Sequence, residues 1–382
     1  MKKAISVLLA LVLVVLGAAP SLAAEFSSEG IDARSCILIE QSTGCVLFEY
    51  NADEALPPAS VTKTMTMLLT LEAIDDGRIA LSDVVSISDN AASMGGSQVF
   101  LSPGETMDVD TLLKCMVVAS ANDAALALAE HIAGSEASFV KMMNDRAVAL
   151  GCGASHFENV TGLDDTTKNH VMSARDIAII SAEVMKHKLI TNYSTLWTDT
   201  IRDGTFGLTN TNRLIRFYDG ATGLKTGSTA KAKFCISATA TRGDVSLIAV
   251  VMGSSTRDTR NALARSLLDF GFANYSVIKH DGGELYEIPL RGGTEHTVRA
   301  RSCPLSLVVN RADLSKAEKT AELPEYISAP IKKGDKIGEI VYRVGDKRIG
   351  SADILADDDI ERISLGSMVK ELFYWLIMAP KS

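Results

Sequence analysis

Apolar residues along the chain follow strand-like and helix-like spacings in turn. Two β-rich runs, residues 35–40 and 45–49, flank Gln41-Ser42-Thr43-Gly44 and predict a hairpin. Helical spacing then predicts helices over residues 60–76, 107–133, 136–150 and 173–188. Strand patterns return over residues 222–226, 232–240 and 245–252, and an amphipathic helix is predicted over residues 257–271. Strands, a helical block and strands that complete the same sheet predict an α+β fold.

The pattern changes after about Asn274. Short β-rich segments with glycine turns, such as Gly282-Gly283 and Gly292-Gly293, predict a small all-β domain over residues 276–356. The preceding α+β region is therefore expected to form one domain over residues 25–275.

The N-terminus has the pattern of an export signal. Lys2 and Lys3 precede an apolar run over residues 4–16 and a small-residue stretch over residues 21–24, which predicts a secretory signal peptide cleaved near Ala23 or Ala24. The run is shorter than the ~20 residues of a spanning helix, which disfavours an uncleaved anchor. With residues 1–24 as signal peptide, the protein is expected at the extracytoplasmic face of the cytoplasmic membrane.

The C-terminal segment, residues 357–382, predicts an amphipathic helix. Its apolar face comprises Leu365, Met368, Val369, Leu372, Phe373, Leu376 and Ile377. Phe373, Tyr374 and Trp375 cluster as aromatic rings do at a membrane–water interface. The segment is too short to span a bilayer, so it either docks on its own domain or lies on a membrane surface.

Composition and charge exclude several classes of protein. The 382 residues are 47% hydrophobic and 22% charged, which is typical of a globular chain with two or three domains. There are 38 basic against 47 acidic side chains, so the net charge of −9 argues against nucleic acid as a partner. Removal of the signal peptide takes away two lysines, which leaves 36 basic against 47 acidic side chains and a net charge of −11. A C-terminal membrane helix would then depend on its aromatic and apolar face.

The six cysteines do not form a metal-binding pattern. They have no C-x-x-C spacing and no histidine at metal spacing, so no metal or other cofactor is expected. An exported protein permits disulfides, and Cys36 and Cys45 could pair across the predicted hairpin. A chain of this length can build its core without them, which favours buried free thiols.

The first motif that suggests chemistry is Ser60-Val61-Thr62-Lys63. Positions i and i+3 share a helix face, so the Ser60 hydroxyl and the Lys63 amine come within contact range. Lys63 could take the Ser60 proton if burial and a neighbouring cation kept the amine neutral. Alone, the pattern also fits a serine that caps a helix.

Two further motifs follow. Ser120-Ala121-Asn122 places two polar side chains in an otherwise apolar helical stretch, where they need partners. Lys225-Thr226-Gly227 begins a predicted strand and could bind a carboxylate. It is not a phosphate-binding loop, because Leu224 stands where that motif needs glycine.

The three motifs in this order are the signature of penicillin-binding proteins and class A β-lactamases. The chain resembles the low-molecular-mass penicillin-binding proteins that are serine-type D-alanyl-D-alanine carboxypeptidases. The resemblance runs from Cys36 to Phe272 and more loosely beyond. Further matches are Pro57-Pro58-Ala59-Ser60, Asp123-Ala124, Thr161-Gly162-Leu163-Asp164, Met172-Ser173-Ala174-Arg175-Asp176, Asn212-Arg213, Gly223-Leu224, Ser228-Thr229 and residues 267–272. Many relatives have glycine where Ala121 stands.

The resemblance implies a β-lactamase/transpeptidase-like catalytic domain, a small β domain and a terminal helix. It also implies catalytic roles. Ser60 would be the acylated nucleophile, Lys63 its base, and Ser120 a proton relay. Asn122 would hold the substrate amide and orient Lys63. Lys225 would keep Lys63 neutral by like-charge repulsion.

The resemblance also implies how substrate is bound. Lys225 and Thr226, followed by Gly227 and Ser228, would hold the terminal carboxylate, and the N–H groups of Ser60 and Ser228 would form the oxyanion hole. Arg260 matches a family arginine near that carboxylate, and Arg213 is a further candidate. For both arginines, a surface ion pair is the alternative. Residues 88–98 are expected to form a flap above the site.

The implied reaction is removal of the terminal D-alanine from peptidoglycan stem peptides that end in D-Ala-D-Ala, with β-lactams as covalent inhibitors. A class A β-lactamase would also carry an acidic E-x-x-L-N loop. The corresponding residues read Glu158-Asn159-Val160-Thr161-Gly162, which lacks that pattern and favours the carboxypeptidase. A catalytically slow sensor of β-lactams or wall peptides is the remaining alternative.

Overall fold

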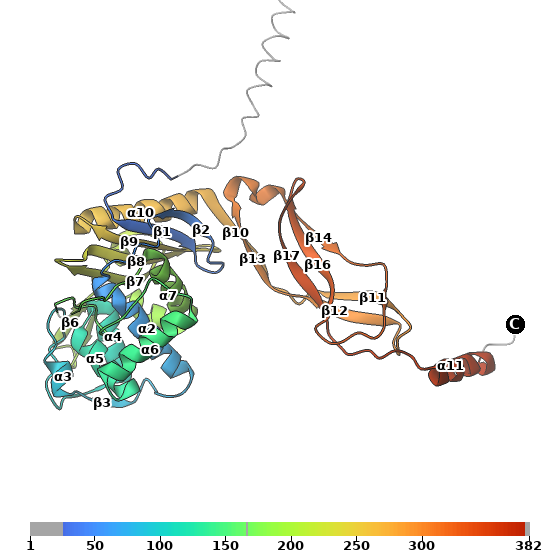
Figure 1. Ribbon diagram of the computed structural model, residues 1–382, viewed down its shortest axis with the longest axis horizontal. Coiled ribbons are helices and arrows are strands. Elements are labelled where there is room, and N and C mark those ends of the chain that lie inside the picture. The colour runs from blue at the N-terminus through green and yellow to red at the C-terminus, as the bar shows by residue number, and fades with distance from the viewer. Residues whose placement is uncertain (1–25, 166, 379–382) are drawn as a thin grey trace, which may run out of the picture. The chain divides into compact units, whose positions relative to one another are not determined.

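The computed structural model describes residues 26–165 and 167–378 (Figure 1). The predicted signal peptide, residues 1–24, lies outside the described residues. The chain divides into two compact units, of which the first ends at Asn274 and the second begins at Tyr275.

An antiparallel five-stranded sheet forms the centre of the first unit, with strand order β2-β1-β9-β8-β7. The strands are β1 (Ser35–Glu40), β2 (Val46–Tyr50), β7 (Ala221–Thr229), β8 (Lys233–Arg242) and β9 (Val245–Ser254). The N-terminal strand β1 pairs with β9 from Ser35 opposite Met252 to Glu40 opposite Leu247. All six residues of β1 are buried, because helices cover both faces of the sheet (Figure 1).

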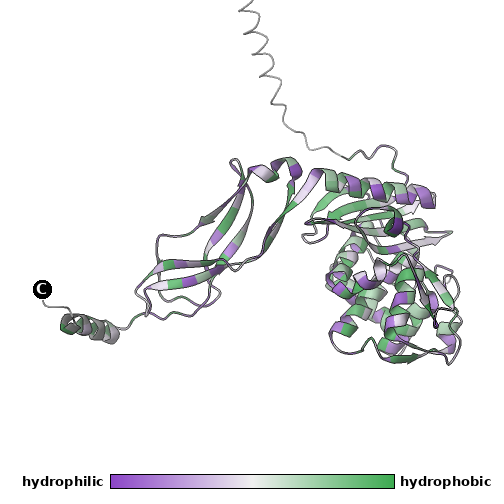
Figure 2. Ribbon diagram, turned by 180° about the vertical axis from the view of Figure 1, so that it is seen from behind, coloured by the Kyte–Doolittle hydropathy of each residue, from purple (hydrophilic) through white to green (hydrophobic). Residues whose placement is uncertain are grey.

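One face of the sheet is covered by a single long helix, α10 (Arg257–Asn274). Hydrophilic and hydrophobic residues alternate along α10 (Figure 2), and its buried face includes Leu267, Leu268 and Phe272. At Gly271 an added Cβ would lie 2.5 Å from a Leu247 methyl carbon, so this glycine lets α10 pack close to β9.

The other face carries the helical block. Its main helices are α2 (Lys63–Asp75), α4 (Val109–Lys114), α5 (Asn122–Ala133), α6 (Glu136–Ala149) and α7 (Ala174–Lys186). Ten of the thirteen residues of α2 are buried, which makes α2 the central helix of the block. Short elements connect these helices and the sheet: η1 (Ala59–Thr62), β3 (Val84–Ser86), α3 (Asp89–Ala92), β4 (Thr106–Asp108), η2 (Cys115–Ala119), η3 (Lys188–Ile190), α8 (Thr191–Ser194), β5 (Thr198–Ile201), β6 (Phe206–Thr209) and α9 (Leu214–Phe217).

The structure differs from the sequence prediction at two helix boundaries. The helix expected over residues 60–76 starts with the 3-10 turn η1 and becomes α-helical at Lys63. The helix expected over residues 107–133 is broken. A π-helical turn, η2, ends at Ala119, the following Ser120 has a left-handed φ of 62°, and α5 begins at Asn122. Apolar residues continue on both sides of this break, so periodicity did not reveal it.

Apart from one short 3-10 helix, the second unit consists of β-strands up to its last helix. A six-stranded sheet has the order β14-β16-β17-β12-β11-β15, and β10 pairs separately with β13. These elements are β10 (Tyr275–His280), β11 (Leu285–Arg291), β12 (Thr297–Ser302), β13 (Leu305–Asn310), η4 (Arg311–Lys316), β14 (Ala317–Glu322), β15 (Ile327–Ser328), β16 (Lys336–Val344) and β17 (Lys347–Ala356). Their core includes Val298, Ile340 and Ile354, all fully buried. The predicted α+β fold followed by an all-β domain is confirmed.

The chain's last described element is α11 (Leu365–Met378). Its apolar side chains that the structure describes are solvent-exposed, with Leu365 82% and Leu372 67% accessible. Among the described residues, no helix has the length and apolar character needed to cross a membrane.

All six cysteines are free. Cys36, Cys115, Cys152 and Cys235 are buried. The disulfide considered between Cys36 and Cys45 does not form, because Cys36 lies opposite Tyr50 at the open end of the hairpin and Cys45 belongs to its turn.

Candidate active site

Ser60 lies in the turn η1, which two glycines approach closely. An added Cβ on Gly227 of β7 would lie 2.8 Å from both the Pro58 oxygen and the Ser60 nitrogen. An added Cβ on Gly162 would lie 1.8 Å from the Ala59 oxygen. Only glycine permits these two approaches, so Gly227 and Gly162 fix the position of Ser60 between the β7 strand and the Glu158–Gly162 loop.

Lys63 is fully buried one turn after Ser60. Its Nζ lies 3.0 Å from Ser60 Oγ and donates to Asn122 Oδ1 at 2.5 Å and to the Thr161 carbonyl oxygen at 3.2 Å. Burial holds the pKa of Lys63 well below its usual range, and the charge of Lys225 lowers it further, against the opposing effect of Asp123. A neutral amine in contact with a hydroxyl is the arrangement needed for a lysine to act as base.

A second serine–lysine pair faces the first. Lys225 Nζ donates to Ser120 Oγ at 2.8 Å and to its neighbouring Thr226 carbonyl at 2.9 Å. Both side chains are buried, and the left-handed backbone of Ser120 ends the preceding helical turn at this point. Burial lowers the pKa of Lys225 to about 7, and the charge of Arg260 contributes to the shift.

Asn122 and Asp123, the first residues of α5, hold the segment that was predicted to be a flap. Asn122 Nδ2 donates to the Gly95 oxygen at 2.6 Å, and the Asn122 backbone N–H donates to the Ser97 oxygen at 2.7 Å. The buried Asp123 carboxylate accepts from the N–H groups of Val99 and Leu101, both at 3.1 Å. The sequence predicted a role for Asn122 but none for Asp123, which was only a further match to the family.

The rest of the third motif lies along β7. Thr226 is buried, and its Oγ1 donates to Thr211 Oγ1 at 2.8 Å. Gly227 lies opposite Cys235 in the strand ladder, and the solvent-exposed Ser228 lies opposite Phe234. The sequence predicted this motif at the start of a strand, but it lies in the middle of β7.

The two candidate arginines occupy different environments. Arg260 is 2% exposed and donates to the Cys235 carbonyl at 3.2 Å and to Asn261 Oδ1 at 2.8 Å, so it forms no surface ion pair of the kind considered for it. Burial lowers the pKa of Arg260 to about 10. Arg213 has a half-exposed side chain 4.0 Å from the Asp258 carboxylate, which is the surface ion pair considered as its alternative.

His170 contacts the helix turn of the nucleophile and was not predicted from the sequence. The Glu158 N–H donates to His170 Nδ1 at 3.0 Å, and Nε2 lies 2.8 Å from Thr62 Oγ1. Because Nδ1 accepts a hydrogen bond, the proton of the neutral ring is on Nε2 and faces Thr62. Burial lowers the pKa of His170 to about 4. No motif marks this histidine.

In the loop over residues 158–162, which lacks the β-lactamase pattern, the acidic residue Glu158 has a structural role. The Glu158 carboxylate accepts from the N–H groups of Lys168 at 2.7 Å and Asn169 at 3.1 Å, which lowers its pKa. Within the same loop, Asn159 Oδ1 accepts from the Gly162 N–H at 2.7 Å and so supports the turn that presents the Thr161 carbonyl to Lys63.

Known proteins share both units of the chain. The family model described as D-alanyl-D-alanine carboxypeptidase matches residues 22–256, and that of the C-terminal domain of penicillin-binding protein 5 matches residues 274–362. D-alanyl-D-alanine carboxypeptidase DacF of Bacillus subtilis is 41% identical over 89% of this chain and 88% of its own length. DacC of Escherichia coli is 33% identical over 87% and 85%. The crystal structure of penicillin binding protein 5 from Haemophilus influenzae has a TM-score of 0.79 at 30% identity, covering 88% of this chain and 100% of that one.

Proposed function

Because the chain belongs to the D-alanyl-D-alanine carboxypeptidase family and is a serine-type hydrolase of that activity, we propose that Ser60 is its acylated nucleophile. The observation that supports this most strongly is the contact of Ser60 Oγ with the fully buried Nζ of Lys63. A lysine in water is protonated at neutral pH, whereas one that is desolvated beside a second cation can be neutral and accept a proton.

Acylation then proceeds in two proton transfers. Ser60 Oγ attacks the carbonyl of the penultimate D-alanine while its proton passes to Lys63 Nζ. The N–H groups of Ser60 and Ser228 stabilise the oxyanion, an interaction of about 3 kcal/mol per donor in enzymes of this type. When the peptide bond breaks, Ser120 donates its proton to the leaving amine and takes in return the proton that Lys63 had accepted, so that Lys63 is neutral again. Lys225, which donates to Ser120 Oγ, keeps that hydroxyl in place.

The acyl-enzyme is released by water. Lys63 is again the base, because it is the buried amine in contact with the ester oxygen of Ser60. Asn122 holds Lys63 through Oδ1 and orients the substrate amide. The terminal carboxylate of the substrate is bound by Lys225, Thr226 and Arg260. Arg213 lies near the outer edge of this carboxylate-binding site.

The substrates are the D-Ala-D-Ala termini of peptidoglycan peptides, and β-lactams acylate the same serine. The intact mass of the protein after mixing with an acyl-D-Ala-D-Ala peptide, and separately with penicillin, tests this. Released D-alanine and a persistent penicillin adduct are expected for the wild type, and neither for Ser60→Ala. A Ser60→Ala protein that still carries penicillin would show a different nucleophile. Fast penicillin hydrolysis would favour a β-lactamase, and a lasting peptide adduct would favour a sensor.

We further propose that residues 25–275 form the catalytic domain, residues 276–356 the β domain, and residues 357–382 a C-terminal segment whose helix α11 lies on the membrane surface. The exposed apolar side chains of Leu365, Val369 and Leu372 support the last part. Export by the signal peptide would place the enzyme at the extracytoplasmic face of the cytoplasmic membrane. Removal of residues 361–382 should release the protein from membranes with its activity kept, and a truncated protein that still sediments with membranes would contradict the proposal.

A further inference from the structure

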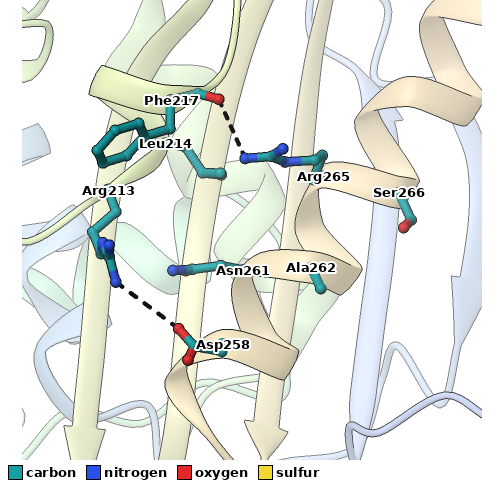
Figure 3. Close-up of a pocket in the computed structure, with 8 residues that line it drawn as sticks. All are labelled: Arg213, Leu214, Phe217, Asp258, Asn261, Ala262, Arg265 and Ser266. Atoms are coloured by element: carbon teal, nitrogen blue, oxygen red, sulfur yellow. Dashed lines mark hydrogen bonds and ion pairs between the residues drawn. The ribbon is translucent and has the colours of Figure 1, made fainter.

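A pocket of about 440 Å³ opens between α9 and the first half of α10 (Figure 3). Its lining includes the buried Leu214, the half-exposed Phe217, and two arginines, Arg213 from the start of α9 and Arg265 from α10. A volume of this size accommodates a ligand as large as an amino acid.

Three N–H donor groups face this pocket. Asn261 Oδ1 accepts from Arg260, which fixes the amide so that its nitrogen extends toward α9 (Figure 3). Arg265 donates to the Phe217 carbonyl oxygen at 3.2 Å, and a guanidinium has five N–H donors in all. Arg213 is 4.0 Å from Asp258, whose side chain is 89% exposed. Such an exposed ion pair is weak, so a ligand carboxylate could take its place.

The charge around the pocket is opposite to that of the protein. The chain as a whole has a net charge of −9. The first nine residues of α10, however, contain Arg257, Arg260 and Arg265 against a single acid, Asp258. Cations near a helix N-terminus are unfavourable because the helix dipole is positive there. Local arrangements that lower stability are typical of binding sites.

We propose that this pocket binds a carboxylate on the side chain of the leaving residue, the last amino acid of the peptide. The proposal rests on the proposed function, in which Arg260 binds the main-chain carboxylate of that residue. Asn261 joins the two places, since its oxygen contacts Arg260 and its nitrogen faces the pocket. Peptides that end in a D-amino acid with an acidic side chain would therefore be cleaved in preference to those with a neutral side chain of the same size.

The test compares acyl-D-Ala-X peptides in which X is D-glutamate, D-2-aminoadipate or D-2-aminopimelate, each against its side-chain amide. For at least one of these three side-chain lengths, the wild-type kcat/KM should be about fivefold higher for the acid than for its amide. Arg265→Gln should reduce this ratio to about one, and Arg265→Lys should restore part of it. Arg78→Gln removes an exposed arginine that pairs with Asp76 and should keep the wild-type ratio. Added salt should lower the ratio in the wild type.

Two results would overturn the proposal directly: a wild type with no preference for the acid at any side-chain length, or a preference that survives in Arg265→Gln. The proposal would also be overturned if Arg265→Gln lowered kcat/KM equally for acid and amide, because that result indicates only a structural role. The peptide with D-alanine as X separates this proposal from the proposed function. Failure of the wild type to release D-alanine and to be labelled by penicillin would contradict the proposed function itself.

Discussion

Lys225 Nζ lies 2.8 Å from Ser120 Oγ, although 105 residues separate them in the chain. Lys225 comes from a strand of the sheet and Ser120 from the break between two helical segments of the helical block. The contact therefore joins the two halves of the first unit across the candidate active site, and it brings a second ammonium group to the neighbourhood of Lys63. Its electrostatic consequence can be measured.

Replacement of Lys225 by glutamine should raise the pKa of Lys63. Burial is the main reason that this pKa is low, and the positive charge of Lys225 is the second. Without that charge, Lys63 takes up a proton at a higher pH, so the acid limb of the acylation profile moves to higher pH. The rate of acylation by penicillin as a function of pH measures this, with Lys141→Gln, an exposed lysine paired with Asp145, as control. An unmoved limb in Lys225→Gln would contradict it.

Gly227→Ala should greatly slow acylation. The new Cβ would lie 2.8 Å from the Ser60 nitrogen, so the nucleophile turn or the strand must shift. Displacement of a reacting group by about 1 Å commonly costs about a hundredfold in rate. Penicillin labelling kinetics measure the effect. The control is Gly207→Ala in β6, where an added Cβ meets nothing within 4 Å and full labelling is expected. A Gly227→Ala enzyme of wild-type rate would show that this close approach is not required.

His170 should make the first unit less stable in mild acid. Its pKa is about 4 in the fold and 6.5 when unperturbed, so the unfolded chain binds the extra proton between these values. Stability from the neutral ring is complete above about pH 6.5 and is lost as the pH falls toward 4, by at most ~3 kcal/mol.

The matched control for His170 is glutamine, which can donate to Thr62 and accept from Glu158 but does not titrate. Urea unfolding, followed by Trp197 fluorescence in a Trp375→Phe background, should show a smaller loss of stability between pH 6.5 and 4 for His170→Gln than for the parent. Identical pH dependence in both proteins would mean that the ring is not held neutral.

Glu158→Gln should leave deacylation within about twofold of the wild-type rate. The Glu158 carboxylate accepts from the backbone of Lys168 and Asn169, and a glutamine oxygen can accept one of these bonds. Mass spectrometry of the penicillin adduct over time gives the rate. Accumulation of acyl-enzyme in the variant would instead assign Glu158 the water-activating role of a class A β-lactamase.

The order of motifs in the sequence was sufficient to predict the fold class and to select the residues that meet around Ser60. Other parts of the site have no sequence pattern. The contact from the Thr161 carbonyl to Lys63 is made by a backbone atom that every residue possesses. The left-handed turn at Ser120 interrupts an apolar run that continues on both sides.

The extent of burial distinguishes Arg260 from Arg213, a difference that the sequence did not reveal. Arg260 and Arg213 both match as candidate ligands of a carboxylate, but one is covered by the sheet and the other is half exposed on α9. Tertiary packing decides this difference, because both residues lie at the start of a helix in the chain.

The position of β1 between β2 and β9 determines when a newly made chain can become active. β1 ends at Glu40, and its partner β9 begins only at Val245. About two hundred further residues must therefore be synthesised before the N-terminal hairpin can pair with its neighbouring strand. Closure of so long a loop is slow compared with local helix formation. Since β7 presses on the Ser60 turn as part of the same sheet, the nucleophile is positioned only after nearly the whole first unit has emerged. A partly emerged chain therefore contains Ser60 and Lys63 but no competent enzyme.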